Sequence, residues 1–131
     1  MERLAIDPSH SYDPVEVAIH VARYSIAFSF AEGRRVLDSS CGEGYGSWLL
    51  LQNGASHVTG VDISPEAIQQ AQTSFNSPLL SFVECDAHHL INYFPHHSFD
   101  LIVSLETVEH IADPKSYLLA LRTLAAEDAV I

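Results

Sequence analysis

The sequence has few cysteines, few basic residues and no long hydrophobic run. Its 131 residues include two cysteines, Cys41 and Cys85, too few for the disulfide framework of a small secreted protein. Acidic residues outnumber basic ones by 17 to 6, which gives a formal net charge of −11. Binding to nucleic acid depends on Lys and Arg contacts with phosphates, and anionic membranes attract basic segments. Neither kind of partner is expected.

No stretch approaches the roughly 20 apolar residues that cross a bilayer, and the first ten residues hold no apolar signal core. With two cysteines in reduced form, these absences predict a cytoplasmic protein without membrane attachment. Hydrophobic residues make up 47% of the chain, so a buried core is possible. The length suits one domain over residues 1–131.

Helical and extended hydrophobic patterns alternate along the chain. Apolar residues spaced by three and four predict an N-terminal helix over about 14–30, followed by a core over about 34–131. Within that core, short apolar runs predict strands at 36–37, 57–61, 79–83 and 99–103. Helical segments are predicted at 46–52 and 65–75, between the first three strands, and at 114–124, after the fourth. Such alternation is typical of βαβ units with a mostly parallel sheet, an α/β fold.

The last three residues, 129–131, have the composition of a fifth strand that has only begun. A strand that stops there leaves an unfinished sheet edge, through which copies of the chain could associate. We therefore expect a fragment of a longer protein, with an oligomeric state that the sequence leaves open.

Polar residues follow the expected strands at the point where each one ends. Asp38, Asp62 and Asp86 close the first three, and a polar stretch begins after Val103. Ligands of parallel α/β sheets bind outside the carboxyl ends of the strands. Agreement among four strand ends predicts a binding site at that edge.

The stretch VLDSSCGEGYGS places Gly42, Gly44 and Gly46 in the turn that follows the first strand. Glycine permits positive φ and lets a ligand approach the backbone closely. A dinucleotide fingerprint reads G-x-G-x-x-G, whereas the spacing here is G-x-G-x-G, with Asp38 directly upstream. A carboxylate repels a pyrophosphate and attracts an ammonium or sulfonium, so the stretch favours a cationic ligand.

The next two acids suit a nucleoside. Asp62 can accept hydrogen bonds from both hydroxyls of a ribose, as acids at that distance from a glycine turn do. Asp86 can accept from an adenine amino group, and Ala87 beside it offers a flat apolar contact.

Four motifs together resemble class I S-adenosylmethionine-dependent methyltransferases: VLDSSCGEGYGS, VTGVDIS, VECDAHHL and FDLIVSLETVEHI. The resemblance covers about residues 14–131. It implies a Rossmann-like three-layer sandwich whose last strands are missing here, with S-adenosylmethionine as cofactor. It also implies a cofactor site, whose residues would be Asp38, Ser40, Gly42, Gly44, Gly46, Asp62, Ile63, Asp86, Ala87 and Ser104. Ser40 stands where the family often has glycine.

Within the family, ETVEHI resembles the loop of small-molecule O-methyltransferases of ubiquinone biosynthesis. Glu106 and His110 are then the candidates for a general base, and the acceptor is expected to be a small molecule. Some relatives hold a divalent metal with this pattern, which would use Glu106, Glu109 and His110. The alternative is that Glu109 and His110 only shape the loop, and no metal is predicted.

Two other functions stay open: an NAD(P)-dependent oxidoreductase, against which the glycine spacing argues, and a non-catalytic nucleoside-binding module. The tracts His88-His89 and His96-His97 are interpreted as solvated or loop histidines, because adjacent side chains on extended backbone point in opposite directions. Tyr24 and Trp48 are expected to pack in the core or in a lid over the site.

Overall fold

The computed structural model describes residues 14–105 and 111–131. It contains a five-stranded parallel sheet in the order β3-β2-β1-β4-β5. The strands are β1 (Arg35–Ser39), β2 (His57–Asp62), β3 (Leu80–Glu84), β4 (Phe99–Ser104) and β5 (Ala125–Val130). The chain moves outward from β1 to β3 and then returns to the other side of β1, so the sheet's switch point lies between β1 and β4.

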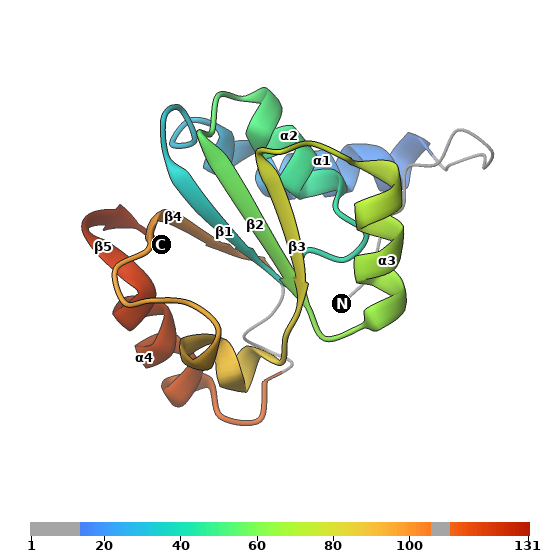
Figure 1. Ribbon diagram of the computed structural model, residues 1–131. Helices are drawn as coiled ribbons and strands as arrows, with labels where there is room; N and C mark the ends of the chain where they lie inside the picture. The colour runs from blue at the N-terminus through green and yellow to red at the C-terminus, as the bar shows by residue number, and fades with distance from the viewer. Residues whose placement is uncertain (1–13, 106–110) are drawn as a thin grey trace.

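Helices cover both faces of the sheet, which gives the three layers that the resemblance implies (Figure 1). One face carries α1 (Pro14–Phe28), α2 (Tyr45–Gln52) and α3 (Pro65–Ser74). The other carries the 3₁₀ helix η1 (Ala87–Asn92) and α4 (Pro114–Leu124). The α/β fold class predicted from the sequence is confirmed.

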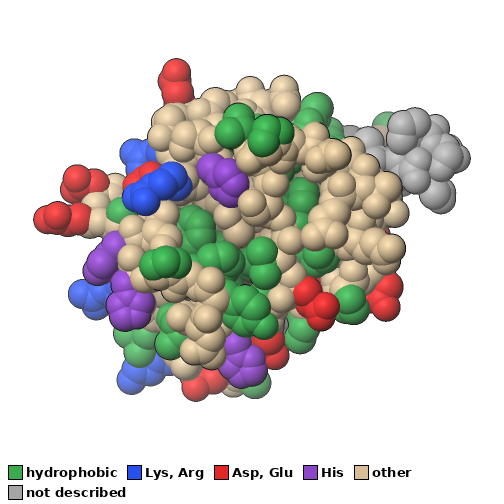
Figure 2. Space-filling view, in the orientation of Figure 1, with side chains coloured by type: hydrophobic (Ala, Val, Ile, Leu, Met, Phe, Trp, Pro, Cys, Tyr) green, Lys and Arg blue, Asp and Glu red, His purple; other side chains and the backbone are tan. Residues whose placement is uncertain are grey.

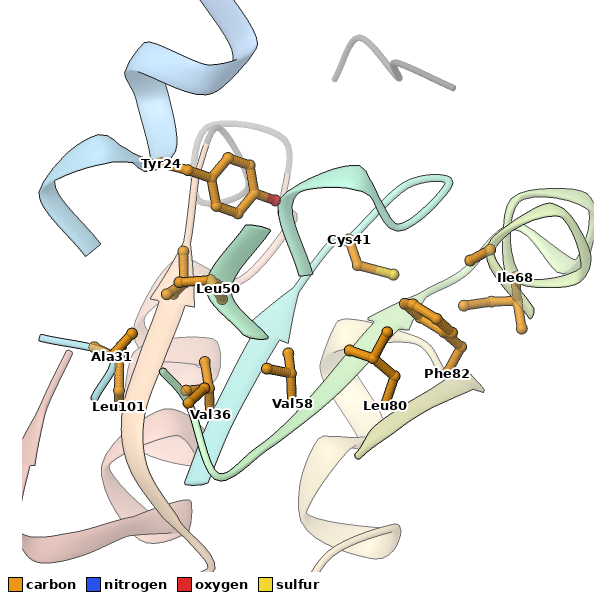
Figure 3. Packing of buried hydrophobic residues seen from close by; sticks show 13 residues of the cluster. Tyr24, Ala31, Val36, Cys41, Leu50, Val58, Ile68, Leu80, Phe82 and Leu101 are labelled. Carbon is orange, nitrogen blue, oxygen red and sulfur yellow. The ribbon is translucent and has the colours of Figure 1, made fainter. Parts of the chain in front are cut away.

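Two hydrophobic cores lie on the two faces of the sheet, because side chains alternate along each strand. Val36 and Leu101 pack under α1 and α2 in the first core, which Figure 3 shows from close by. Leu37 and Ile102, one position further along the same strands, pack against α4 in the second. Both faces of the central strands are therefore buried.

The helix boundaries follow local signals in the sequence. Ser64 caps α3 by accepting a hydrogen bond from the Ala67 backbone N–H, with Pro65 as the first helical residue. Asp113 caps α4 in the same way through the Ser116 N–H. Gly54 follows α2 with a φ of +98°, the left-handed conformation that commonly ends a helix.

Several element bounds differ from expectation, most of them by one or two residues. Helix α1 ends at Phe28 rather than at residue 30, and η1 was not predicted. The prediction that the fifth strand begins at residue 129 is wrong, since β5 begins at Ala125 directly after α4. Its middle residues, Glu127 and Asp128, are exposed and have low strand propensity, and its register against β4 is interrupted by an irregularity.

Within the part of the chain that the structure describes, no helix has the length and apolar character needed to cross a membrane.

Candidate functional site

The sheet brings the predicted strand-end residues to one edge. Asp38 lies in β1, Asp62 ends β2, Asp86 follows β3, and Ser104 ends β4. In the register of the sheet, Asp38 is opposite Gly60 of β2 and Val103 of β4. The three acids therefore follow one another across neighbouring strands on one side of the switch point, and Ser104 lies on the other side.

Asp38 is buried, with 1% of its surface exposed, and its carboxylate is enclosed by hydroxyl groups. Tyr24 Oη lies 3.1 Å from both carboxylate oxygens, and Ser47 Oγ donates to Oδ2 at 2.7 Å. These partners come from α1 and α2, so two helices meet on this one carboxylate. Among the described residues, no Lys, Arg or His side chain forms an ion pair with Asp38.

Burial raises the pKa of Asp38 to about 7, because the charged form loses its hydration. The hydrogen bonds from Ser47 and Tyr24 act in the opposite direction, and the nearby charge of Asp62 adds to the increase. Burial also raises the pKa of the Tyr24 hydroxyl well above its usual value, with Asp38 as the next cause. A cationic group beside Asp38 would relieve the cost of its charge.

The ring of Tyr24 fills the space above Gly46. A Cβ at position 46 would overlap the Tyr24 ring atoms, and Figure 3 shows that ring reaching from α1 towards α2. Tyr24 is 4% exposed, so it is core packing, as expected, and it also covers Asp38. The close approach at this glycine is made by the protein's own side chain.

Three other positions of the turn adopt left-handed conformations. Gly42 has a φ of +57°, and Gly44, the N-cap of α2, has a φ of +96°. A Cβ at Gly44 would lie 2.9 Å from Ala71 and from Phe82, so packing also requires glycine there. Ser40 has a φ of +64°, which explains why glycine suits this position.

Asp62 ties the turn to the next strand. Its Oδ2 accepts from the Gly42 backbone N–H at 2.9 Å, and its Oδ1 accepts from the Ser64 N–H at 3.0 Å. Each carboxylate oxygen has a second lone pair, so the group can still accept from two ligand hydroxyls. The residue after it, Ile63, is 65% exposed and adds apolar surface beside the carboxylate.

Asp86 caps η1, with Ala87 as the first residue of that helix. Its Oδ1 accepts from the His88 backbone N–H at 2.9 Å and meets His88 Nδ1 at 3.0 Å. The backbone hydrogen bond is the main cause that lowers the pKa of Asp86. Both bonds use Oδ1, which leaves Oδ2 to accept from a ligand.

Three hydroxyl groups connect the strands on either side of the switch point. Tyr117 Oη, from α4, donates to Ser39 Oγ at 2.7 Å and lies 2.7 Å from Ser104 Oγ. Ser39 and Ser104 are register partners in β1 and β4. Ser39 and Tyr117 are each 1% exposed, whereas Ser104 is partly exposed.

A model of a methyltransferase domain matches residues 37–131 of the chain, which include every acid and glycine of this site. The chain belongs to the methyltransferase domain family. The resemblance to class I S-adenosylmethionine-dependent methyltransferases is therefore confirmed.

Relatives of this methyltransferase domain include a ubiquinone biosynthesis O-methyltransferase of Pseudomonas entomophila (strain L48). The two are 33% identical over 115 residues, which cover 86% of this chain and 47% of that protein. The chain thus spans about half the length of the curated relatives that it matches.

Two solved structures show how widely the fold is used. The complex between the Haloferax volcanii Trm112 methyltransferase activator and the putative methyltransferase matches with a TM-score of 0.77 and 27% identity, over 86% of this chain and 50% of that one. The [4+2]-cyclase SpnF matches with a TM-score of 0.75 and 18% identity, over 92% and 45%. Since a cyclase has the same fold, the fold alone does not decide the reaction.

The predicted base and metal candidates of the methyltransferase domain, Glu106, Glu109 and His110, lie outside the described residues. Inside residues 14–105 and 111–131, no group of three or more His, Cys, Asp or Glu side chains is placed to hold a metal ion. The histidine tracts are exposed, as expected, and Figure 2 shows histidines spread over one face of the molecule.

The site residues fit S-adenosylmethionine in charge and order. A desolvated carboxylate at Asp38 suits a cationic end, and Asp62 and Asp86 keep acceptor capacity for a ribose and an adenine. One feature opposes direct contact: the Tyr24 hydroxyl covers Asp38, so an ammonium reaches that carboxylate only after Tyr24 moves.

Sequence reasoning missed one residue of this site and part of the role of another. Tyr117 received no functional role, although Tyr117, Leu121 and Leu124 form a buried stripe on α4 whose polar end faces the strand ends. Tyr24 was expected in the core, but its contact with Asp38 depends on how α1 docks. For Tyr117, the position of a tyrosine at the end of that apolar stripe was the available signal.

Proposed function

We propose that this methyltransferase domain binds S-adenosylmethionine across the carboxyl ends of β3, β2 and β1, and serves methyl transfer to a hydroxyl group of a small molecule. The observation that carries the proposal is the series Asp86, Asp62, Asp38, on three adjacent strands beside a glycine turn. The family membership and the ubiquinone biosynthesis relatives support the reaction class.

Each residue has a distinct task in this proposal. Asp62 accepts the ribose hydroxyls, while Asp86 and Ala87 hold the adenine edge and face, with Ile63 covering the nucleoside. The turn from Ser40 to Gly46 lies along the amino-acid end, and Asp38 supplies the negative charge there. The bound cofactor supplies a methyl group on a sulfonium, so the chain mainly has to orient it.

The acceptor is proposed to be a small molecule because the relatives modify one and because the chain carries a net charge of −11, which opposes nucleic acid. Glu106 and His110 remain the proposed candidates for removing a proton from the acceptor hydroxyl. The oxidoreductase alternative has no support from the family match.

Calorimetric titration with S-adenosylhomocysteine, the demethylated cofactor product, tests the proposal. Asp62→Asn should weaken binding by roughly tenfold or more, because hydrogen bonds to a charged group are worth roughly 1.5–3 kcal/mol. Glu84→Gln is the matched control: Glu84 is the exposed register partner of Asp62 on β3, and its change should leave affinity within about twofold.

Absence of binding by the folded wild-type chain would contradict the proposal, as would equal affinity of the wild type and Asp62→Asn. A parallel titration with NAD should give no binding. Transfer of a radiolabelled methyl group by the full-length protein then separates an enzyme from a nucleoside-binding module.

A further inference from the structure

The three linked hydroxyls of Tyr117, Ser39 and Ser104 determine which way the hydroxyl of Ser104 is turned. Tyr117 has a single hydroxyl hydrogen, and it donates that hydrogen to Ser39 Oγ. The 2.7 Å contact between Tyr117 Oη and Ser104 Oγ therefore takes its hydrogen from Ser104. The Ser104 hydroxyl can therefore accept a hydrogen bond from a ligand through its lone pairs, but it cannot donate one.

Ser104 lies where the amino-acid end of the proposed ligand would arrive. Adenine at Asp86 and ribose at Asp62 align the ligand from β3 through β2, and the same line continues over β1 to β4. Adjacent strands are about 4.8 Å apart, so three spacings give roughly 14 Å, the length of an extended S-adenosyl amino acid. A hydroxyl that can only accept then faces an ammonium group, which can only donate.

We infer that Tyr117 is a positioning residue that holds the Ser104 hydroxyl as a hydrogen-bond acceptor for the ammonium group of the cofactor. The inference rests on the proposed function, which supplies the ligand, and goes beyond it in assigning the Ser104 side chain and a residue buried beneath it. Tyr117 cannot touch the ligand itself, because it is 1% exposed. It acts by fixing the rotation of a neighbouring hydroxyl.

Ser39 is the other anchor of this arrangement. Without its oxygen, Tyr117 can turn its hydrogen towards Ser104, and Ser104 would then present a hydrogen to the ligand instead of a lone pair. Ser39, which is 1% exposed, would thus alter ligand binding without touching the ligand.

The test compares two ligands that share the nucleoside and the sulfur atom. S-adenosylhomocysteine carries the amino-acid end, and 5′-methylthioadenosine lacks it. Calorimetry on the full chain should show that Ser104→Ala weakens S-adenosylhomocysteine binding by roughly tenfold and Tyr117→Phe by roughly threefold or more, since the lost bond involves a charged group. Binding of 5′-methylthioadenosine should stay within about twofold of wild type in both.

Three further variants complete the design. Ser104→Thr retains a hydroxyl and should retain wild-type affinity for both ligands. Ser39→Ala should weaken S-adenosylhomocysteine alone. Tyr93→Phe removes a phenol from a tyrosine that is 54% exposed, and should change neither affinity. Thermal melting of each variant checks that it is folded.

Equal losses for the two ligands would show that Tyr117 and Ser104 only support the structure, and unchanged affinities would show that Ser104 makes no contact; either result overturns the inference. If Tyr117→Phe does not fold, the partly exposed Ser104→Ala and Ser104→Thr pair decides the outcome. Failure of the wild type to bind both ligands overturns the proposed function as well. If the wild type binds both ligands and no variant changes either affinity, the inference about Tyr117 fails and the proposed function is retained.

Discussion

Replacing Asp38 by Asn should make the ligand-free protein progressively more stable relative to wild type as the pH rises from 4 to about 7. The carboxyl has a pKa raised from 3.8 to about 7 in the folded state, mainly by burial. The native state therefore binds this proton more tightly than the unfolded chain does. The resulting stability is fully present below pH 4 and is lost as the pH rises to about 7.

The size of the effect follows from the two pKa values. A difference of roughly a thousandfold in proton affinity corresponds to about 4 kcal/mol, an upper limit on what ionised Asp38 costs the folded state at pH 8. Asparagine has the same shape and no charge, so Asp38→Asn escapes that cost. Loss of the hydrogen bonds from Tyr24 and Ser47 would change the difference in unfolding free energy between variant and wild type by the same amount at every pH. The dependence of that difference on pH would remain.

Urea unfolding between pH 4 and pH 8, followed by the fluorescence of Trp48, measures this slope. The unfolding free energy of the variant minus that of the wild type should increase with pH up to about 7 and then level off. Among the residues that the structure describes, Tyr24, Cys41 and Asp62 are the titratable groups that interact with this carboxylate. A difference that does not change with pH would refute the argument that Asp38 is held by burial with a raised pKa.

Three other predictions concern packing, backbone strain and a surface ion pair. Gly46→Ala should destabilise the fold by about 1–3 kcal/mol in urea unfolding through overlap with the buried Tyr24 ring, and adding Tyr24→Ala should reduce the cost of that methyl group. Ser40→Gly should stabilise by about 0.5–1 kcal/mol, because relief of the left-handed conformation exceeds the entropy cost of glycine; an unchanged urea midpoint would contradict this. Asp100, whose pKa is lowered to about 2 chiefly by the hydrogen bond from Arg35, stabilises the protein above its unfolded pKa, and this stability is lost as the pH falls towards 2. Above about pH 4, the wild type should therefore be more stable than Asp100→Asn. Acid titration of both proteins, followed by circular dichroism, should show that this difference in stability disappears as the pH falls from about 4 towards 2.

Local signals predicted the sheet and the edge at which the site lies. Asp38, Asp62 and Asp86 reach that edge because each follows an apolar run, and parallel strands necessarily place their carboxyl ends together. Caps such as Ser64 and Asp113 act within one helical turn, and Ser or Asp followed by Pro is a local signature of a helix start. The family resemblance included the acids and glycines that these signals had selected, and it added Ser40 and Ile63.

Contacts between distant segments could not be predicted in this way. The Tyr24–Asp38 contact depends on the docking of α1, and the Tyr117–Ser39 bond joins residues far apart in the chain. The glycine turn illustrates the difference: its left-handed geometry followed from the sequence, whereas the side chains that fill the space above Gly44 and Gly46 did not. Strand β5 was misplaced because Glu127 and Asp128 resemble a loop, and pairing with β4 overrides that preference.

The fit of Tyr24 over Gly46 links two positions in natural variation. A lineage that exchanges the tyrosine for a smaller residue opens room at position 46, and only then does a side chain become tolerable there. Homologues are therefore expected to change these two positions in concert, and a glycine conserved on its own, without an aromatic partner on α1, would point instead to a ligand pressing on the backbone.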